Sequence, residues 1–184
     1  MMRPSFVASV ILVSLIWVGC GSPPAPRISD APQTVLEPVR AVPSDRAAIA
    51  LRAENGKFVC ADLGRDGLLV ADRSGKGEWE TITLVPQEGG RFALLAANGK
   101  YVSADRERAS NLIANRDDVG EWEVFELIPA GDGAYNIRSS DGKFVSAALD
   151  KTGDEFAILS ANRDTADTWE RFTLLREGSP GGQP

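Results

Sequence analysis

Charged side chains able to bind a polar ligand are concentrated in three short stretches, residues 62–67, 105–110 and 149–155. They are Asp62, Arg65, Asp66, Asp105, Arg106, Arg108, Asp150, Lys151 and Asp154. Carboxylate, guanidinium and ammonium groups are strong hydrogen-bond acceptors and donors, and this is the chemistry that orients a hydroxyl-rich or charged ligand. Because the three stretches differ in sequence, we treat these residues as candidate ligand-binding residues.

Catalysis and metal binding find little support in the residue types present. The chain has no histidine, which removes Ser-His-Asp and Cys-His catalysis and the commonest metal ligand. A calcium loop starting at Asp62 is disfavoured because its third position is Gly64 and its twelfth is Arg73. Two acidic pairs, at 117–118 and 154–155, have no fixed separation of the kind that glycoside hydrolysis needs. We therefore expect no enzyme activity, no cofactor and no metal.

An arginine, a tryptophan and a glutamate recur together three times along the chain. The three sets are Arg73, Trp79 and Glu80; Arg116, Trp122 and Glu123; and Arg163, Trp169 and Glu170. Each arginine could form an ion pair with its glutamate. A feature present in every copy is more often part of a scaffold than of a site, so we predict that the tryptophans fill a core, with stacking on a sugar as the alternative. The predicted core aromatics are Phe58, Trp79, Tyr101, Trp122, Phe144 and Trp169.

These sets belong to an internal repeat. Gly56, Gly99 and Gly142 are spaced 43 residues apart, and the tryptophans are spaced 43 and then 47 residues apart. Self-similarity at a fixed period is the signature of a repeat architecture. We predict one domain over residues 45–177, with repeats at about 47–90, 91–133 and 134–177.

Each repeat has the pattern of four short strands. Ile49, Leu51 and Ala53 alternate with polar or small residues, as do their counterparts in the other copies, and a period of two is typical of a half-buried strand. Asn55-Gly56 and its counterparts predict a two-residue type I′ hairpin turn. The fourth strand is expected to begin at the tryptophan, with a bulge at the glutamate. The reason is that the next apolar residue lies three positions after the tryptophan, and a regular strand cannot place both on one face.

The repeated segment resembles that of fascin-like proteins. The resemblance rests on Asn/Asp-Gly-Lys-aromatic-Val-Ser/Cys-Ala, the later Leu-x-Ala and the closing Trp-Glu-x-Phe-x-Leu, and it covers about residues 47–176. It implies an all-β fold, a single β-trefoil of three four-stranded repeats. Fascins bundle actin with four tandem trefoils, so one trefoil implies an actin-binding-like surface without bundling. The Gln-x-Trp motif of ricin-type trefoil lectins is absent.

The first residues indicate targeting. Phe6–Val18 is an apolar run of thirteen residues, which suits a signal peptide over 1–20 better than a membrane span of about 20 residues. The run ends Trp17-Val18-Gly19-Cys20, which resembles a bacterial lipobox with Cys20 as the lipidated residue. A simple secretory signal and an uncleaved N-terminal anchor are the alternatives. Residues 21–44 contain six prolines and predict a disordered tether, and 178–184 a disordered tail.

Charge narrows the partners. The net charge of −6 disfavours nucleic acid, which needs a basic face. We expect a monomeric binding module that is anchored to the cell envelope by its lipid alone. In an organism with an outer membrane, the expected location is that membrane or the cell surface; without lipidation, the protein would be secreted. Its expected partner is a carbohydrate or, alternatively, an envelope protein for which it acts as a scaffold.

Overall fold

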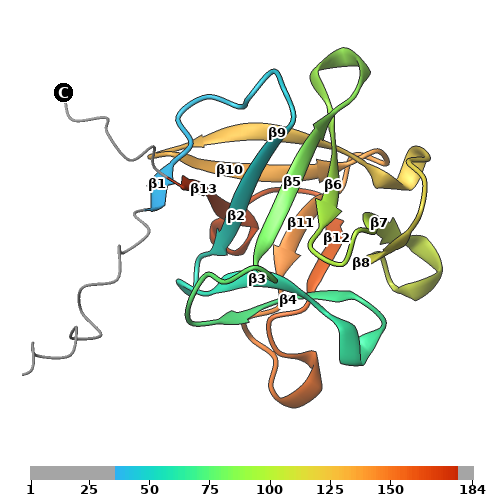
Figure 1. Ribbon diagram of the computed structural model, residues 1–184. Coiled ribbons are helices and arrows are strands. Elements are labelled where there is room, and N and C mark those ends of the chain that lie inside the picture. Colours follow the sequence, from blue (N-terminus) through green and yellow to red (C-terminus); the bar gives the residue numbers. More distant parts are fainter. Residues whose placement is uncertain (1–35, 178–184) are drawn as a thin grey trace, which may run out of the picture. The chain divides into compact units, whose positions relative to one another are not determined.

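The computed structural model describes residues 36–177, and their secondary structure consists of strands and short 3₁₀ turns (Figure 1). The predicted signal, Cys20, residues 21–35 of the tether and the tail lie outside this range. Among the described residues, no helix is long and apolar enough to cross a membrane. The strands are β1 (Leu36–Pro38), β2 (Ala47–Ala53), β3 (Phe58–Asp62), β4 (Leu68–Arg73), β5 (Thr81–Pro86), β6 (Phe92–Ala96), β7 (Tyr101–Asp105), β8 (Asn111–Arg116), β9 (Val124–Gly131), β10 (Ala134–Ser139), β11 (Phe144–Ala147), β12 (Leu159–Arg163) and β13 (Arg171–Glu177).

Six of the strands pair into a closed antiparallel ring. Following the hydrogen bonds, the order is β2, β5, β6, β9, β10, β13 and back to β2. Figure 1 shows β2, β5 and β6 side by side in this ring. A closed ring leaves none of its six strands with an unpaired edge.

Six further strands form three hairpins, β3–β4, β7–β8 and β11–β12, which are joined to one another. Three residues with positive φ, Gly67, Ser110 and Ala157, connect them. Their carbonyl oxygens accept hydrogen bonds from the backbone N–H groups of Ala114, Ala161 and Ala71, respectively, at 2.8–2.9 Å. Each hairpin is thereby bonded to the next in a cyclic arrangement.

The alternating apolar residues fill one shared core, as predicted. Ile49, Leu51 and Ala53 of β2 are buried in it, together with their counterparts on β6 and β10. Leu69, Leu112 and Leu159 of the hairpins contribute to the same core. The three copies therefore supply equivalent apolar side chains to a single centre, which none of them could build alone.

The hairpin turns differ from the predicted type I′ geometry. The N–H of Gly56 donates to the carbonyl of Ala53 (2.9 Å), which closes a turn over Glu54 and Asn55. Gly56 has φ +73°, whereas Asn55 is not among the described residues with positive φ. The connection is thus a turn followed by a left-handed glycine. The Asn55 side chain stabilises it by accepting from Lys57 N and donating to Ala71 O.

The predicted start of the fourth strand is also corrected. Trp122 and Trp169 lie in 3₁₀ turns, η5 (Glu121–Glu123) and η7 (Thr168–Glu170), and Trp79 lies in a turn. The strands β5, β9 and β13 begin only after the glutamate. A turn satisfies the three-residue spacing without a bulge, because the tryptophan is no longer part of the strand.

The N-terminal boundary of the folded part lies earlier than predicted. Leu36–Pro38, which the proline content assigns to the disordered tether, pair as β1 with β13, and Val39 N donates to Leu174 O at 2.7 Å. Val39 is 3% exposed and belongs to the main core. The apolar Val39 side chain and the last residues of β13, which extend beyond the part paired with β10, outweigh the high proline content here.

Candidate functional site

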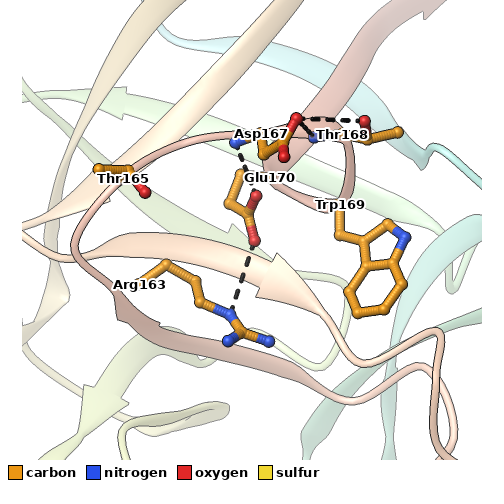
Figure 2. A pocket seen from close by; sticks show the side chains of 6 residues that line it. All are labelled: Arg163, Thr165, Asp167, Thr168, Trp169 and Glu170. Atoms are coloured by element: carbon orange, nitrogen blue, oxygen red, sulfur yellow. Dashed lines mark hydrogen bonds and ion pairs between the residues drawn. The ribbon is translucent and has the colours of Figure 1, made fainter.

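The third repeat contains an open pocket of about 370 Å³ beside Trp169. Figure 2 shows Arg163, Glu170 and Trp169 around it, with Thr165, Asp167 and Thr168 completing the wall. Glu170 Oε1 lies 3.7 Å from Arg163 Nε. The glutamate side chain is almost fully buried and the arginine side chain is half exposed. The buried carboxylate therefore holds the guanidinium in place, and the N–H donors of the guanidinium face solvent.

Local backbone chemistry fixes this pocket. Glu170 Oε2 accepts a hydrogen bond from the backbone N–H of Asp167 (2.8 Å), and Asp167 Oδ1 accepts one from Thr168 N (2.9 Å). The two acidic side chains satisfy N–H groups at the start of η7 that have no partner within the turn. Arg163 ends β12, so the ladder of that strand positions the guanidinium.

The first repeat contains a related pocket of about 440 Å³ beside Trp79. Its wall includes Arg73, Glu80, Asp62, Leu63 and Cys60. Glu80 Oε2 again accepts from a backbone N–H three residues earlier, that of Gly77, at 2.7 Å. Arg73 Nε donates to Cys60 Sγ (3.2 Å) and lies 3.3 Å from Asp72 Oδ1. The predicted Arg73–Glu80 ion pair is thus replaced by these two contacts.

The second repeat has the equivalent residues Arg116, Trp122 and Glu123, but another side chain lies over its tryptophan. Arg116 lies between Asp105 (3.6 Å) and Glu123 (3.8 Å), and Glu123 Oε2 accepts from Gly120 N at 2.8 Å. The guanidinium of Arg106 lies over the Trp122 ring, 5.5 Å from its centroid. The predicted pairs Arg116–Glu123 and Arg163–Glu170 are therefore both present.

The prediction that the tryptophans fill the core is wrong. Trp79 is 52% exposed, and Trp122 and Trp169 are only partly buried. The buried apolar residue stands three positions later, at Ile82, Phe125 and Phe172. The turn that precedes the strand holds each indole outside the barrel, and the following glutamate takes the buried position.

The other predicted core aromatics are also peripheral. Phe58 is buried, but in a small separate cluster with Ala50 and Leu175. Tyr101 and Phe144 are partly buried. They are the first residues of β7 and β11, one residue before the valines Val102 and Val145 that enter the main core.

Four of the predicted ligand-binding residues link the loops of different repeats. Arg108 pairs with Asp66 at 2.7 Å, and Arg65 donates to the carbonyl of Asp154 at 2.7 Å. The loops of all three repeats are linked in this way. Arg65 also pairs with Asp62 at 2.8 Å.

Four predicted residues, Asp62, Asp105, Asp150 and Lys151, have other surroundings as well. Asp62 and Asp105 cap the 3₁₀ turns η2 (Leu63–Arg65) and η4 (Arg106–Arg108) by accepting from Gly64 N and Glu107 N, and Asp62 also lines the Trp79 pocket. Asp150 and Lys151 are exposed, ahead of η6 (Gly153–Glu155), and line neither tryptophan pocket. Only Asp62 and Arg106 are thus at a tryptophan.

The lysines that follow the hairpin turns fix the loops that lead to the tryptophans. Lys57 donates to Ser74 Oγ (2.8 Å), Lys100 to Asp117 (2.5 Å) and Lys143 to Asp164.

The hydrogen bond and charge of Asp164 raise the pKa of Lys143. The hydrogen bond from Arg65 is the largest influence that lowers the pKa of Asp62, and burial raises that of the Cys60 thiol. Among residues 36–177, no group of three or more His, Cys, Asp or Glu side chains could hold a metal ion.

Comparison with a family model places this domain. The model of a domain of unknown function, DUF7910, matches residues 45–152. The chain belongs to the DUF7910 family. No curated protein matches this DUF7910 chain in sequence.

Solved structures show the type of fold. A designed three-fold symmetric protein, ThreeFoil, is 19% identical with a TM-score of 0.61, over 70% of this chain and 98% of its own. An exo-β-1,3-galactanase from Clostridium thermocellum is 20% identical (TM-score 0.58; 73% of this chain, 30% of its own). A Polyporus squamosus lectin, bound to Neu5Acα2-6Galβ1-4GlcNAc, is 14% identical (0.58; 71% and 49%). This DUF7910 chain therefore spans under half of the last two proteins, and it has a β-trefoil-like fold.

Proposed function

We propose that this DUF7910 domain is a non-catalytic module that binds carbohydrate at the Trp79 and Trp169 pockets. The observation that carries the proposal is the same in both pockets. A solvent-accessible indole lies beside an arginine whose position is set by neighbouring side chains, and a buried glutamate closes the adjoining turn. The two pockets replace the loop clusters as the primary candidate site.

Sugar recognition uses this combination of groups. The C–H face of a pyranose ring packs on an aromatic face, and its hydroxyl groups exchange hydrogen bonds with charged side chains. Small-ligand sites have volumes of about 300–1,000 Å³, and the two pockets are at the lower end of that range. Each holds acidic and basic groups together, which favours a neutral sugar over a strongly charged one.

The structural neighbours suggest which sugar to test. One is named a β-1,3-galactanase, and another is a lectin bound to a glycan that contains galactose. We propose a galactose-containing glycan as the ligand, with N-acetyllactosamine (Galβ1-4GlcNAc) as the first probe. Galactose has an apolar face made by several ring C–H groups, which suits stacking on an indole.

The finer architecture forms part of the same proposal. The recurring strands, turns and tryptophan pockets support a single fascin-like β-trefoil of three repeats. The sequence of residues 1–44 supports display on the cell envelope through a lipidated Cys20 and a tether. In this arrangement the membrane contact comes from lipid alone.

A glycan array followed by calorimetric titration tests the function. We expect the full chain to bind N-acetyllactosamine saturably. Trp79→Ala and Trp169→Ala should each weaken binding at one pocket by about fivefold or more, because loss of stacking costs about 1 kcal/mol or more. Phe156→Ala is a matched control, because Phe156 is an exposed aromatic outside both pockets.

Two results would refute the carbohydrate proposal: no binding to any glycan by folded protein, or binding that survives loss of both tryptophans. The second candidate function is docking of an envelope protein. The exposed apolar side chains of Leu63 (52%) and Phe156 (40%) favour it, since they lie on loops that the Arg65–Asp154 contact ties together. Cross-linking in the native envelope would then be the next measurement.

A further inference from the structure

The second repeat contains the residues of a tryptophan pocket, but its tryptophan is covered. The Arg106 guanidinium lies 5.5 Å from the centroid of the Trp122 ring. In the first repeat the residue at the position of Arg106 is Leu63, which lines the wall of an open pocket. The covering side chain is therefore particular to the second copy.

Three weak contacts hold Arg106 in place. Its Nη2 lies 3.7 Å from Glu121 Oε1 and donates to Ser140 Oγ at 3.4 Å, and its Nε lies 3.7 Å from Asp141 Oδ2. Each contact is long and involves a partly exposed guanidinium, so each is weak. Ser140 and Asp141 belong to the hairpin turn of the third repeat. Arg106 thus spans the boundary between two repeats, and its side chain is 38% exposed.

Two polar atoms of this repeat are buried without a partner among the described residues: Ser103 Oγ and Asn115 Oδ1. Ser103 is fully buried, and its counterpart in the first repeat, Cys60, lines the Trp79 pocket. The counterpart pair in the third repeat, Ser146 and Asn162, is within hydrogen-bond range of each other at 3.5 Å. Unpartnered buried oxygens are unfavourable, so a hydroxyl group that reached them would be bound favourably.

We infer that Trp122 marks a third carbohydrate site, which Arg106 keeps closed. The inference rests on the function proposed for the Trp79 and Trp169 pockets. Opening requires only that Arg106 give up its cation–π contact with Trp122 and its three long contacts. A galactoside could then stack on Trp122, with its hydroxyl groups near Arg116 and the unpartnered oxygens. The chain would then have two open carbohydrate sites, at Trp79 and Trp169, and one closed site, at Trp122.

The test uses the full chain with Trp17→Phe, Trp79→Ala and Trp169→Ala, so that Trp122 is the remaining tryptophan. Arg106→Ala is added to this background, and Arg108→Ala, from the same turn but paired with Asp66, is the matched control. Acrylamide quenching measures access to the Trp122 indole without any ligand. Calorimetric titration with N-acetyllactosamine measures binding, and the unmutated chain is titrated in parallel.

We expect Arg106→Ala to raise the quenching constant of Trp122 about twofold, because a covering cation is removed. The same change should create saturable N-acetyllactosamine binding. The parent variant that retains Arg106 and the Arg108→Ala control should both lack this binding. An unchanged quenching constant would overturn the closure by Arg106. A more accessible indole without binding, while the unmutated chain binds, would overturn the third site alone. No binding by the unmutated chain would overturn the proposed function together with this site.

Discussion

The arginine beside each tryptophan has a different set of neighbours in each repeat. Arg163 faces Glu170, Arg116 lies between Asp105 and Glu123, and Arg73 donates to the Cys60 thiol. The guanidinium groups are about half exposed in all three cases. The hydrogen-bonding capacity that remains for a ligand therefore differs among the three positions, although the sequence pattern is the same.

The Cys60 thiol, which is the neighbour of Arg73, should make the free energy of unfolding depend on pH. Burial raises the pKa of its thiol, although the hydrogen bond from Arg73 acts in the opposite direction. Below the ordinary thiol pKa of about 8.5 the group is neutral in both the folded and the unfolded chain. Above it the unfolded chain ionises first, so the free energy of unfolding falls as pH rises toward the higher folded pKa.

We therefore expect the free energy of unfolding to decline from about pH 7.5 to about pH 9.5 more steeply in the native chain than in Cys60→Ser, whose hydroxyl does not titrate there. Urea denaturation under reducing conditions at both pH values measures the two slopes. Equal slopes would show that the folded thiol ionises as readily as the unfolded one.

The turn before each fourth strand is a structural unit in its own right. In all three copies the buried glutamate accepts a hydrogen bond from the backbone N–H three residues earlier. This carboxylate closes the turn, and the same turn holds the indole at the protein surface. Stability and site geometry are thereby coupled through one side chain.

Replacing Glu123 by alanine should lower the free energy of unfolding by about 1–3 kcal/mol, because the buried carboxylate loses its hydrogen bond from the Gly120 N–H and its ion pair with Arg116. Urea denaturation measures the change. Glu107→Ala, an exposed glutamate in η4, is the control and should stay within about 0.5 kcal/mol of the parent. Equal stability of the two variants would contradict a closing role for Glu123.

The hairpin connections make a second prediction at this scale. Gly67 has φ +78°, and a Cβ on it would lie 2.5 Å from the backbone oxygen of Ala114. Gly67→Ala should cost about 3 kcal/mol or more, because strain and a backbone clash add together. Gly142 has φ +84° but open space around it, so Gly142→Ala should cost only about 1–2 kcal/mol. Thermal and urea unfolding compare the two, and equal losses would mean that the hairpin contact is dispensable.

The elements also show which features a sequence can predict. The alternation in Ile49, Leu51 and Ala53 predicts the core correctly, because a strand with one buried face must follow a period of two. The place of the tryptophans was missed, because a Trp-Glu step reads equally well as strand or as turn. Asp167 three residues before Glu170 is a capping-box signal that could have revealed it, but Gly77 and Gly120 offer no side chain there.

The candidate site was predictable only in part. Residue types place arginine, tryptophan and glutamate together in each repeat, and the structure keeps two of the three ion pairs. The cover over Trp122 depends on Arg106 meeting Ser140 and Asp141, which are far along the chain. Such a contact follows from tertiary placement alone, and no local pattern encodes it.

At the scale of the whole folded unit, β1 and Val39 set the N-terminal boundary. We expect a chain that begins at residue 45 to be less stable than one that begins at residue 35 by about 2 kcal/mol or more, because Val39 and the β1–β13 hydrogen bonds are lost. Guanidinium unfolding of both chains measures this. A chain from residue 35 carrying Val39→Ala should fall between them, and equal stability of all three would place the boundary at 45 as the sequence alone suggests.

The pairing of β1 with β13 brings residue 36 opposite residue 177. The two ends of the folded unit are therefore adjacent, and a short flexible link could join them while new ends are opened in the exposed turn at Glu88–Gly90. Circular permutation and insertion into a loop of a host protein both require this adjacency. The unit has the geometry of a cassette, which can be placed within another chain as readily as at its end.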